Sequence, residues 1–226
     1  MKGNDDKLLD TRQRLLQAAG EVFARRGFKS ATVREISLRA KANIAAINYH
    51  FGDKEGLYSA VLEHSLGSAL KKYPPDLNVT TKSRAEERLD AFIRSFLSRL
   101  LDDGRPAWHG KLVALEIANP TAALDQIIET VIGPLYAHLT VIVRELMADS
   151  ADEESIHACV FSIMGQCLFF HHSRHVITKL YPQELGAGAI GRLTNHITKF
   201  SMGAIKGLAG QAEKMTRGIS DNPTSL

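Results

Sequence analysis

Two short helix-forming patterns on either side of a tight polar turn, between residues 31 and 58, constrain the fold of this chain more than any other feature. Thr32 and Glu35 have the spacing of a capping box, which predicts a helix from Val33 to about Ala40. Three polar or small residues follow, and a second helix is expected over residues 44–50. Two helices this short cannot bury an apolar face by themselves, so they must pack on a neighbouring element.

That neighbour is predicted immediately upstream. Asp10 and Gln13 have capping-box spacing, and apolar residues recur at helical intervals until Gly27. The three predicted helices together have the layout of a helix-turn-helix unit, in which the last helix lies in the major groove of DNA.

The outer face of the predicted helix 44–50 has small residues at its start and polar residues at its end. Small side chains let a helix enter the groove deeply, Asn48 suits an adenine edge, and Ala45 or Ala46 suits a thymine methyl group. Polar and basic neighbours are better placed to contact phosphates, which fix the register. The residues predicted to contact DNA are Thr32, Arg34, Asn43, Ala45, Ala46, Asn48, Tyr49, His50 and Lys54.

The charge distribution agrees with this interpretation. Residues 1–58 contain eleven Lys or Arg and seven Asp or Glu, whereas the remaining 168 residues contain seventeen and eighteen. A basic surplus confined to one small domain is what binding to duplex DNA requires, although by itself it is weak evidence.

The run ATVREISLRAKANIAAINYHFGDKEGLY, preceded by the helix AAGEVFARRGF, resembles the DNA-binding domain of the TetR family of transcriptional regulators. Tyr49, His50, Phe51 and Lys54 lie in its most characteristic part. Many members have Tyr at the position of Asn48, so base readout is expected to differ there. Three shorter runs resemble the CecR (YbiH) subgroup of this family. They are EIANP at 116–120, Gly-Pro at 133–134 and SIMGQ at 162–166.

No segment has the alternating pattern of a strand, so the expected fold is all-α: an N-terminal three-helix domain followed by a larger helical domain for ligand binding and dimerisation. The expected division is a flexible arm over 1–9, the helix-turn-helix domain over 10–53, the effector-binding and dimerisation domain over 54–209, and a disordered tail over 210–226.

The segment 158–170 is apolar on nearly all faces, so it must be covered on more than one side. A two-fold bundle formed with the last helix, 187–208, would cover it, and the resemblance implies the same mode of dimerisation. The alternative is that both helices fill a single core. The predicted interface consists of Val160, Ile163, Cys167, Phe170, Leu193, Ile197, Phe200 and Ala204.

The C-terminal two-thirds is also expected to enclose a cavity for an apolar or aromatic effector. Its predicted lining is Phe96, Leu100, Trp108, Leu112, Leu115, Glu116, Phe161, Met164, Gln166, Leu168 and His171, although each of these also suits plain core.

Cys167, His171 and His175 recur at one-turn spacing and raise an alternative, a helical metal-binding protein or enzyme. No further ligand is evident in the sequence, so neither a metal nor a cofactor is expected. Catalytic motifs are also missing, which argues against an enzyme. The polar, acidic N-terminus is no secretory signal, and the longest apolar run, 158–170, is too short to span a bilayer.

The sequence therefore predicts a cytoplasmic, homodimeric repressor that binds a palindromic DNA operator and is released by a small molecule.

Overall fold

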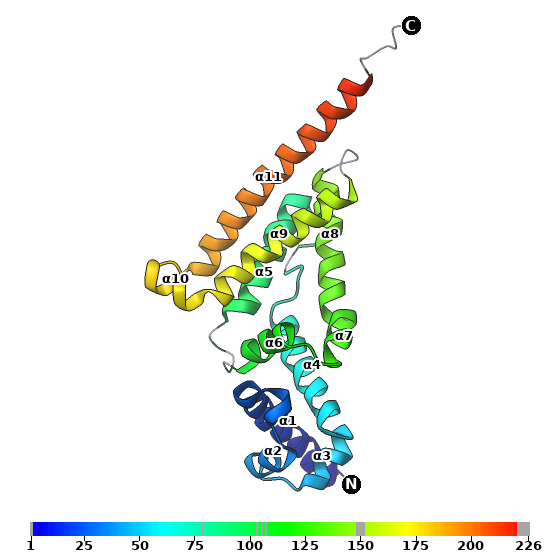
Figure 1. Cartoon of the computed structure of the whole chain (residues 1–226), viewed down its shortest axis with the longest axis vertical. Helices are drawn as coiled ribbons and strands as arrows, with labels where there is room; N and C mark the ends of the chain where they lie inside the picture. The colour runs from blue at the N-terminus through cyan, green and yellow to red at the C-terminus, as the bar shows by residue number, and fades with distance from the viewer. Residues whose placement is uncertain are drawn as a thin grey trace. The chain divides into compact units, whose positions relative to one another are not determined.

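A computed structural model describes residues 2–77, 79–102, 104, 106, 108–147 and 152–220, and side chains only from 10 to 210. The chain is all-α within these ranges, as predicted (Figure 1). The helices are α1 (Lys2–Ser30), α2 (Val33–Ala40), α3 (Ile44–Phe51), α4 (Lys54–Lys72), α5 (Ala85–Leu101), α6 (Trp108–Ala118), α7 (Ala123–Ile127), the π-helical turn η1 (Ile128–Ile132), α8 (Gly133–Met147), α9 (Glu153–His172), α10 (Arg174–Leu180) and α11 (Ala189–Ser220).

The chain forms two compact units, and their border does not coincide with the expected division at residue 53. The first unit comprises residues 1–71 and 103–133, and the second comprises 72–102 and 134–226. The first unit therefore contains α6, α7 and η1 in addition to the helix-turn-helix. We call it the head.

Helix α6 belongs to the head because its aromatic end packs on α1. Trp108 is only 7% exposed and Leu112 is fully buried, and both lie in one apolar core with Leu15, Val22 and Phe23 of α1. The two helices approach closely at Gly20, where an added Cβ would lie 2.5 Å from Cζ3 of Trp108. A side chain at residue 20 would therefore force the indole ring away.

A buried carboxylate holds α6 to α4. Glu116 is 1% exposed and accepts hydrogen bonds from the Tyr58 hydroxyl at 2.8 Å and from the Thr121 amide at 2.7 Å. Burial, together with the Glu116 carboxylate, raises the pKa of the Tyr58 phenol, so the hydroxyl keeps the proton that it donates. The network joins α4, α6 and the turn before α7.

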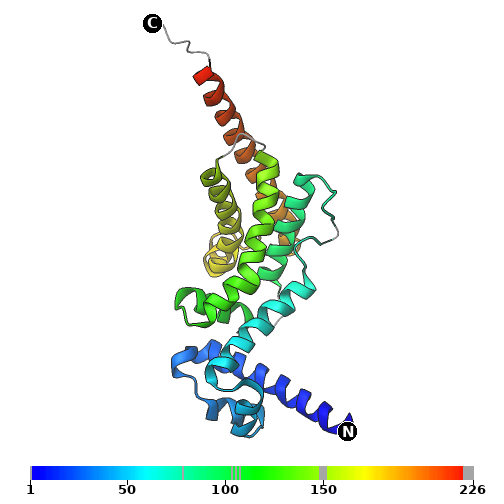
Figure 2. The same cartoon turned by 90° about the vertical axis from the view of Figure 1, so that its right-hand side faces the viewer.

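The second unit has its own core, built from α5, α8, α9 and α11. Phe92 and Leu97 of α5 pack with Ile142 of α8, Ile163 of α9 and Ile197 of α11, each at most 1% exposed. Figure 2 shows α5, α8 and α9 beside the first part of α11, whose C-terminal part extends beyond them. The partly buried Arg99 donates to the Tyr73 carbonyl oxygen at 2.8 Å, and burial lowers its pKa to about 10.

Both ends of the chain are more helical than expected. Helix α1 begins at Lys2, so the residues expected to form a flexible arm are helical from there, and the acidic residues near its start favour a helix N-terminus. Helix α11 continues to Ser220, because residues 211–220 include several good helix formers. Of the tail expected to be disordered, 210–220 is thus helical, and 221–226 lies outside the described residues.

One segment is long and apolar enough to span a membrane by length and composition alone, contrary to the sequence-based expectation. It is Ala123–Met147, which comprises α7, η1 and α8. Core helices of globular proteins pass the same test, and Leu139, Ile142 and Val143 of α8 are buried in the second core. The segment is therefore weak evidence for a membrane location.

The close approach at Gly20 gives a test of the head. We expect Gly20→Ala to destabilise the protein by about 1–3 kcal/mol, because the added methyl group overpacks the contact with Trp108. Gly67→Ala in α4 is the matched control, since no atom lies within 4 Å of its Cβ position, and it should stabilise the helix by up to about 1 kcal/mol. Urea unfolding measures both changes. Equal stabilities for the two variants would contradict the packing.

Candidate nucleic-acid interface

Two helix caps shape the α2–α3 segment. The Thr32 hydroxyl accepts a hydrogen bond from the Glu35 amide at 3.2 Å, which starts α2 as the sequence predicts. The Asn43 side chain accepts one from the Ala45 amide at 2.9 Å and starts α3. Lys41, between the helices, adopts the left-handed conformation with φ of 51° and ends α2. The sharp turn between the helices is therefore specified locally.

Arg14 fixes this turn to α1. Its guanidinium donates to the backbone carbonyl oxygens of Ala40 at 3.2 Å and Lys41 at 3.4 Å. On the side of α3 that faces the apolar core of the head, Ile47 is fully buried. These contacts fix the orientation of α3 relative to α1.

The structure leaves most of the predicted base-reading residues exposed. Asn43, Ala45 and Asn48 are exposed, and Tyr49 is 74% exposed. Ala46 differs, because it is half-buried and packs against the core of the head. Ala46 is therefore less accessible to a base than predicted, whereas the side chain of Ala45 is exposed.

The predicted phosphate contacts divide in a similar way. Thr32 and Arg34 are exposed. Lys54 is half-buried, and its ammonium donates to the Lys29 carbonyl oxygen at 3.2 Å and lies 4.6 Å from the centre of the Phe28 ring. Its three donors allow a further contact, but it also joins the start of α4 to the end of α1.

His50 is half-buried, between the rings of Tyr49 and Phe51. Its Nε2 atom is buried and has no hydrogen-bond partner among the described residues. An acceptor that arrives with a ligand, such as a phosphate oxygen, would satisfy this nitrogen when it is protonated.

Three other cations of the head are already paired with carboxylates. Arg25 and Arg26 both contact the Glu35 carboxylate, and Arg39 contacts Glu21. A hydrogen bond from the Gln17 amide and the charge of Arg39 hold the pKa of Glu21 below its usual value. These cations contribute less to the surface potential than their number suggests.

Comparisons with known proteins agree with this arrangement. A family model described as bacterial regulatory proteins, tetR family, matches residues 15–61, and one for the C-terminal domain of the transcriptional dual regulator CecR matches residues 85–205. The regulator CecR of Shigella flexneri is 30% identical over 174 residues, covering 74% of this chain and 78% of that protein. The chain belongs to the TetR family. The transcriptional repressor NicS of Pseudomonas putida is 28% identical, covering 77% of this chain and 82% of that protein.

Solved structures show the same fold. A Rhodococcus protein of the tetR family superposes with a TM-score of 0.64 at 17% identity, covering 86% of this chain and 96% of that one. The hemolysin II transcriptional regulator HlyIIR gives 0.54 at 23% identity, covering 84% and 98%. The predicted family is thus confirmed. This protein is a DNA-binding transcriptional regulator, and its relatives are regulators rather than enzymes.

The residues predicted to line an effector cavity are not brought together in one unit. Trp108, Leu112, Leu115 and Glu116 belong to the head, where Trp108 and Leu112 are core and Glu116 is bonded to Tyr58. The other seven belong to the second unit, and one of them, Phe161, is 62% exposed. The remaining six are Phe96, Leu100, Met164, Gln166, Leu168 and His171.

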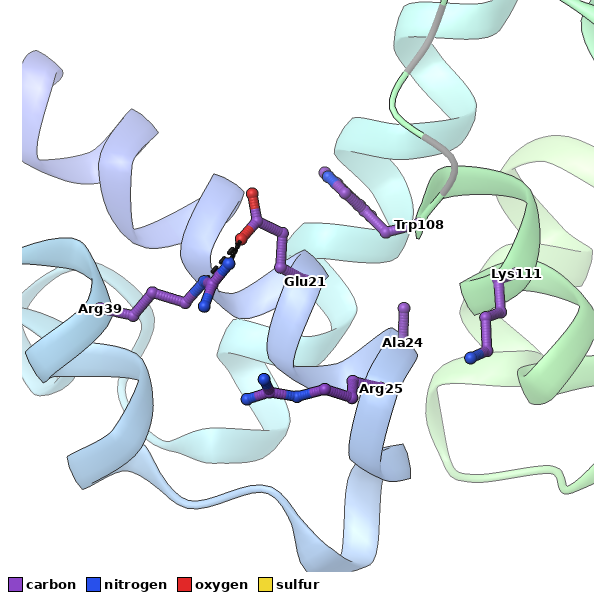
Figure 3. A pocket seen from close by; sticks show the side chains of 6 residues that line it. All are labelled: Glu21, Ala24, Arg25, Arg39, Trp108 and Lys111. Atoms are coloured by element: carbon purple, nitrogen blue, oxygen red, sulfur yellow. Dashed lines mark hydrogen bonds and ion pairs between the residues drawn. The ribbon is translucent and has the colours of Figure 1, made fainter. Parts of the chain in front are cut away.

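An open crevice of about 360 Å³ does lie in the head, between α1, α2 and α6 (Figure 3). Of the predicted cavity residues it contains only Trp108. Figure 3 shows Glu21 of α1 bound to Arg39 of α2, with Arg25 one turn further along α1 and Lys111 of α6 at the right. Its lining is mostly charged and differs from the apolar cavity expected for an effector.

The Cys167, His171 and His175 stripe is interrupted. Helix α9 ends at His172, and His175 lies in α10. Burial raises the pKa of the Cys167 thiol to about 12, and burial lowers that of His171, whose Nδ1 atom donates to the Leu100 carbonyl oxygen at 3.0 Å. No group of three or more metal-binding side chains occurs in the part of the chain that the structure describes.

Five residues of the predicted dimer interface lie in the core of their own protomer. Val160, Ile163, Cys167, Leu193 and Ile197 are each at most 1% exposed. These side chains are therefore covered within the protomer. The sequence could not show this for α9, because the pattern of a helix that is apolar on all sides does not indicate which side faces the core. Phe170 is half-buried, while Phe200 and Ala204 are exposed.

The cap of α3 gives a second test. We expect Asn43→Ala to cost about 1 kcal/mol of stability, because the Ala45 amide loses its acceptor. Asn43→Ser keeps a capping oxygen and should retain most of that stability. Thermal unfolding of the two variants measures the difference. If they unfold alike, the side chain does not cap the helix.

Proposed function

We propose that this regulator is a dimeric, ligand-responsive repressor that binds a palindromic operator through α3 and is released by a small molecule. The observation that carries the proposal is the exposed face of α3, where Ala45 and Asn48 are exposed while Ile47 is fully buried. Two copies are required because one short helix reads few base pairs, and half-sites about 34 Å apart suit a two-fold dimer. The printed name of NicS, a repressor, supports the direction of control.

Exposed apolar stripes on α9 and α11 support dimerisation. Phe161 and Phe169 of α9 and Phe200 of α11 are 62%, 57% and 61% exposed, although large apolar side chains are usually covered. Small residues near them leave open space in the protomer: no atom lies within 4 Å of the Cβ positions of Gly165 and Gly203. A second copy of α9 and α11 would cover both stripes and form a four-helix bundle.

The proposed effector site lies in the second unit, between α5 and α9. Phe96, Leu100 and Met164 pack there as half-buried apolar side chains. The Nδ1 proton of His171 is donated to the Leu100 carbonyl, so Nε2 remains an acceptor when the ring is neutral. The effector proposed for this site is an apolar or aromatic molecule with one hydrogen-bond donor.

Control of DNA binding would pass through α4, which begins at Lys54 in the head and ends at Lys72 in the second unit. We propose that effector binding tilts this helix and changes the separation of the two heads. The effect on operator affinity can be no larger than the difference in effector affinity between the two states.

Gel shifts against the intergenic DNA beside the regulator's own gene test the proposal. We expect specific, salt-sensitive binding of two protomers, or a multiple of two, per site. Apolar or aromatic compounds that raise the melting temperature should also release the DNA. Binding without any sequence preference would refute operator recognition, and a stoichiometry of one protomer would refute the dimer.

Two substitutions distinguish the proposed phosphate contact of Lys54 from the proposed base contact of Asn48. Lys54→Ala should weaken binding to all sequences alike and reduce the slope of log K against log salt by about 1, because one phosphate contact is lost. Asn48→Ala should instead change which sequences are preferred. Binding to a randomised duplex library, followed by sequencing, measures both. An Asn48 variant with unaltered preferences would show that the reading face lies elsewhere.

The dimer surface gives a further test. Phe161→Glu combined with Phe200→Glu should yield monomers, because each charge would be buried in the interface. Leu180→Glu is the control, since Leu180 is 80% exposed but lies on α10, outside the stripes. Sedimentation measures the mass. A dimeric double variant would place the interface on another face.

A further inference from the structure

One apolar side chain on the reading helix was not among the predicted contacts. Ile44 is the first residue of α3 and is 43% exposed. Neighbouring apolar residues behave differently: Ala42, Ala46 and Phe51 all pack against the core of the head, whereas Ile44 is not part of that core. Its side chain therefore contributes little to the packing of the head.

Ile44 lies on the same side of α3 as Asn48. The two residues are four positions apart, so they lie one above the other on the helix surface. Asn48 is exposed as well, whereas Ile47, which lies on the adjacent edge of the helix, is fully buried. Any ligand that contacts Asn48 on this face also meets Ile44.

Only one feature of a base edge suits a branched aliphatic side chain. In the major groove, the C5 methyl group of thymine is apolar, and the other groups there donate or accept hydrogen bonds. The N-terminal residues of a recognition helix are those that contact base edges. We propose that Ile44 is a specificity-determining residue that reads a thymine methyl group in each half-site. This inference rests on the proposed placing of α3 in the major groove.

The geometry also limits where that thymine lies. Four residues of α-helix rise about 6 Å, and successive base pairs are about 3.4 Å apart. The thymine read by Ile44 is thus expected roughly two steps from the base read by Asn48. Ala45, next to Ile44, has too short a side chain to replace it.

The test uses the full chain and deoxyuridine, which lacks only the C5 methyl group of thymine. The duplex is the sequence that the wild-type protein selects from a random library, with each thymine replaced in symmetric pairs. We expect one such pair to weaken wild-type binding by about fourfold per half-site, the value for one buried methyl-sized group. Fluorescence anisotropy at fixed salt measures the dissociation constants.

Ile44→Ala should bind the thymine and deoxyuridine duplexes with equal dissociation constants at that position. At all other positions it should keep the differences in dissociation constant that the wild-type protein shows. Ile44→Val should retain part of it, which guards against a folding defect in the alanine variant. Leu38→Ala is the matched control, because Leu38 is 72% exposed on α2 and also lies outside the apolar core. It should retain the full difference.

Two results would overturn the inference: wild-type protein that binds every uracil duplex as tightly as its thymine counterpart, or an Ile44→Ala variant that keeps each difference. The proposed function fails in a distinguishable way. If Ile44→Ala and Asn48→Ala both select the wild-type sequence, α3 is not the reading helix. If only Asn48→Ala changes the selection, α3 reads the operator without a contribution from Ile44.

Discussion

The contact between Trp108 and Gly20 determines what the head consists of. Without a side chain at residue 20, the indole ring packs directly on α1 and brings the buried Leu112 into the same core. Two turns after Trp108, Glu116 bonds to Tyr58 and so attaches α6 to α4 as well. The unit that carries the reading helix thus includes a helix from the middle of the chain.

Local chemistry explains why the sequence predicted the reading unit well. The Thr32 cap of α2 and the Asn43 cap of α3 both act within three residues, and the spacing of Thr32 and Glu35 alone locates the start of α2. The position of α6 depends on a contact between residues 20 and 108, for which no local pattern exists. The same limit applies to α9. Its apolar residues occupy all sides, so periodicity could not decide that Val160 is core and Phe161 is exposed.

The extent of the proposed reading face on α3 was also not determined by the sequence pattern. Helix α3 has only two turns, and a single fully buried residue, Ile47, sets which way it faces. The sequence identifies Ile47 as a core residue, yet it does not say how far the buried sector extends on either side. The structure includes Ala46 in that sector and excludes Ile44. A change of two residues turns the expected contact surface from small and polar to partly aliphatic.

This composition bears on how the regulator discriminates between sequences. Several cations of the head are held by carboxylates or backbone oxygens, among them Arg39 by Glu21 and Arg14 by the carbonyl oxygens of Ala40 and Lys41. The sequence-independent attraction to phosphates is correspondingly weaker, and it falls further as salt rises. The apolar and amide contacts that we propose for Ile44 and Asn48 would not be screened in this way. Added salt should therefore reduce non-specific binding more than it reduces discrimination between bases, so that a modestly charged head remains selective.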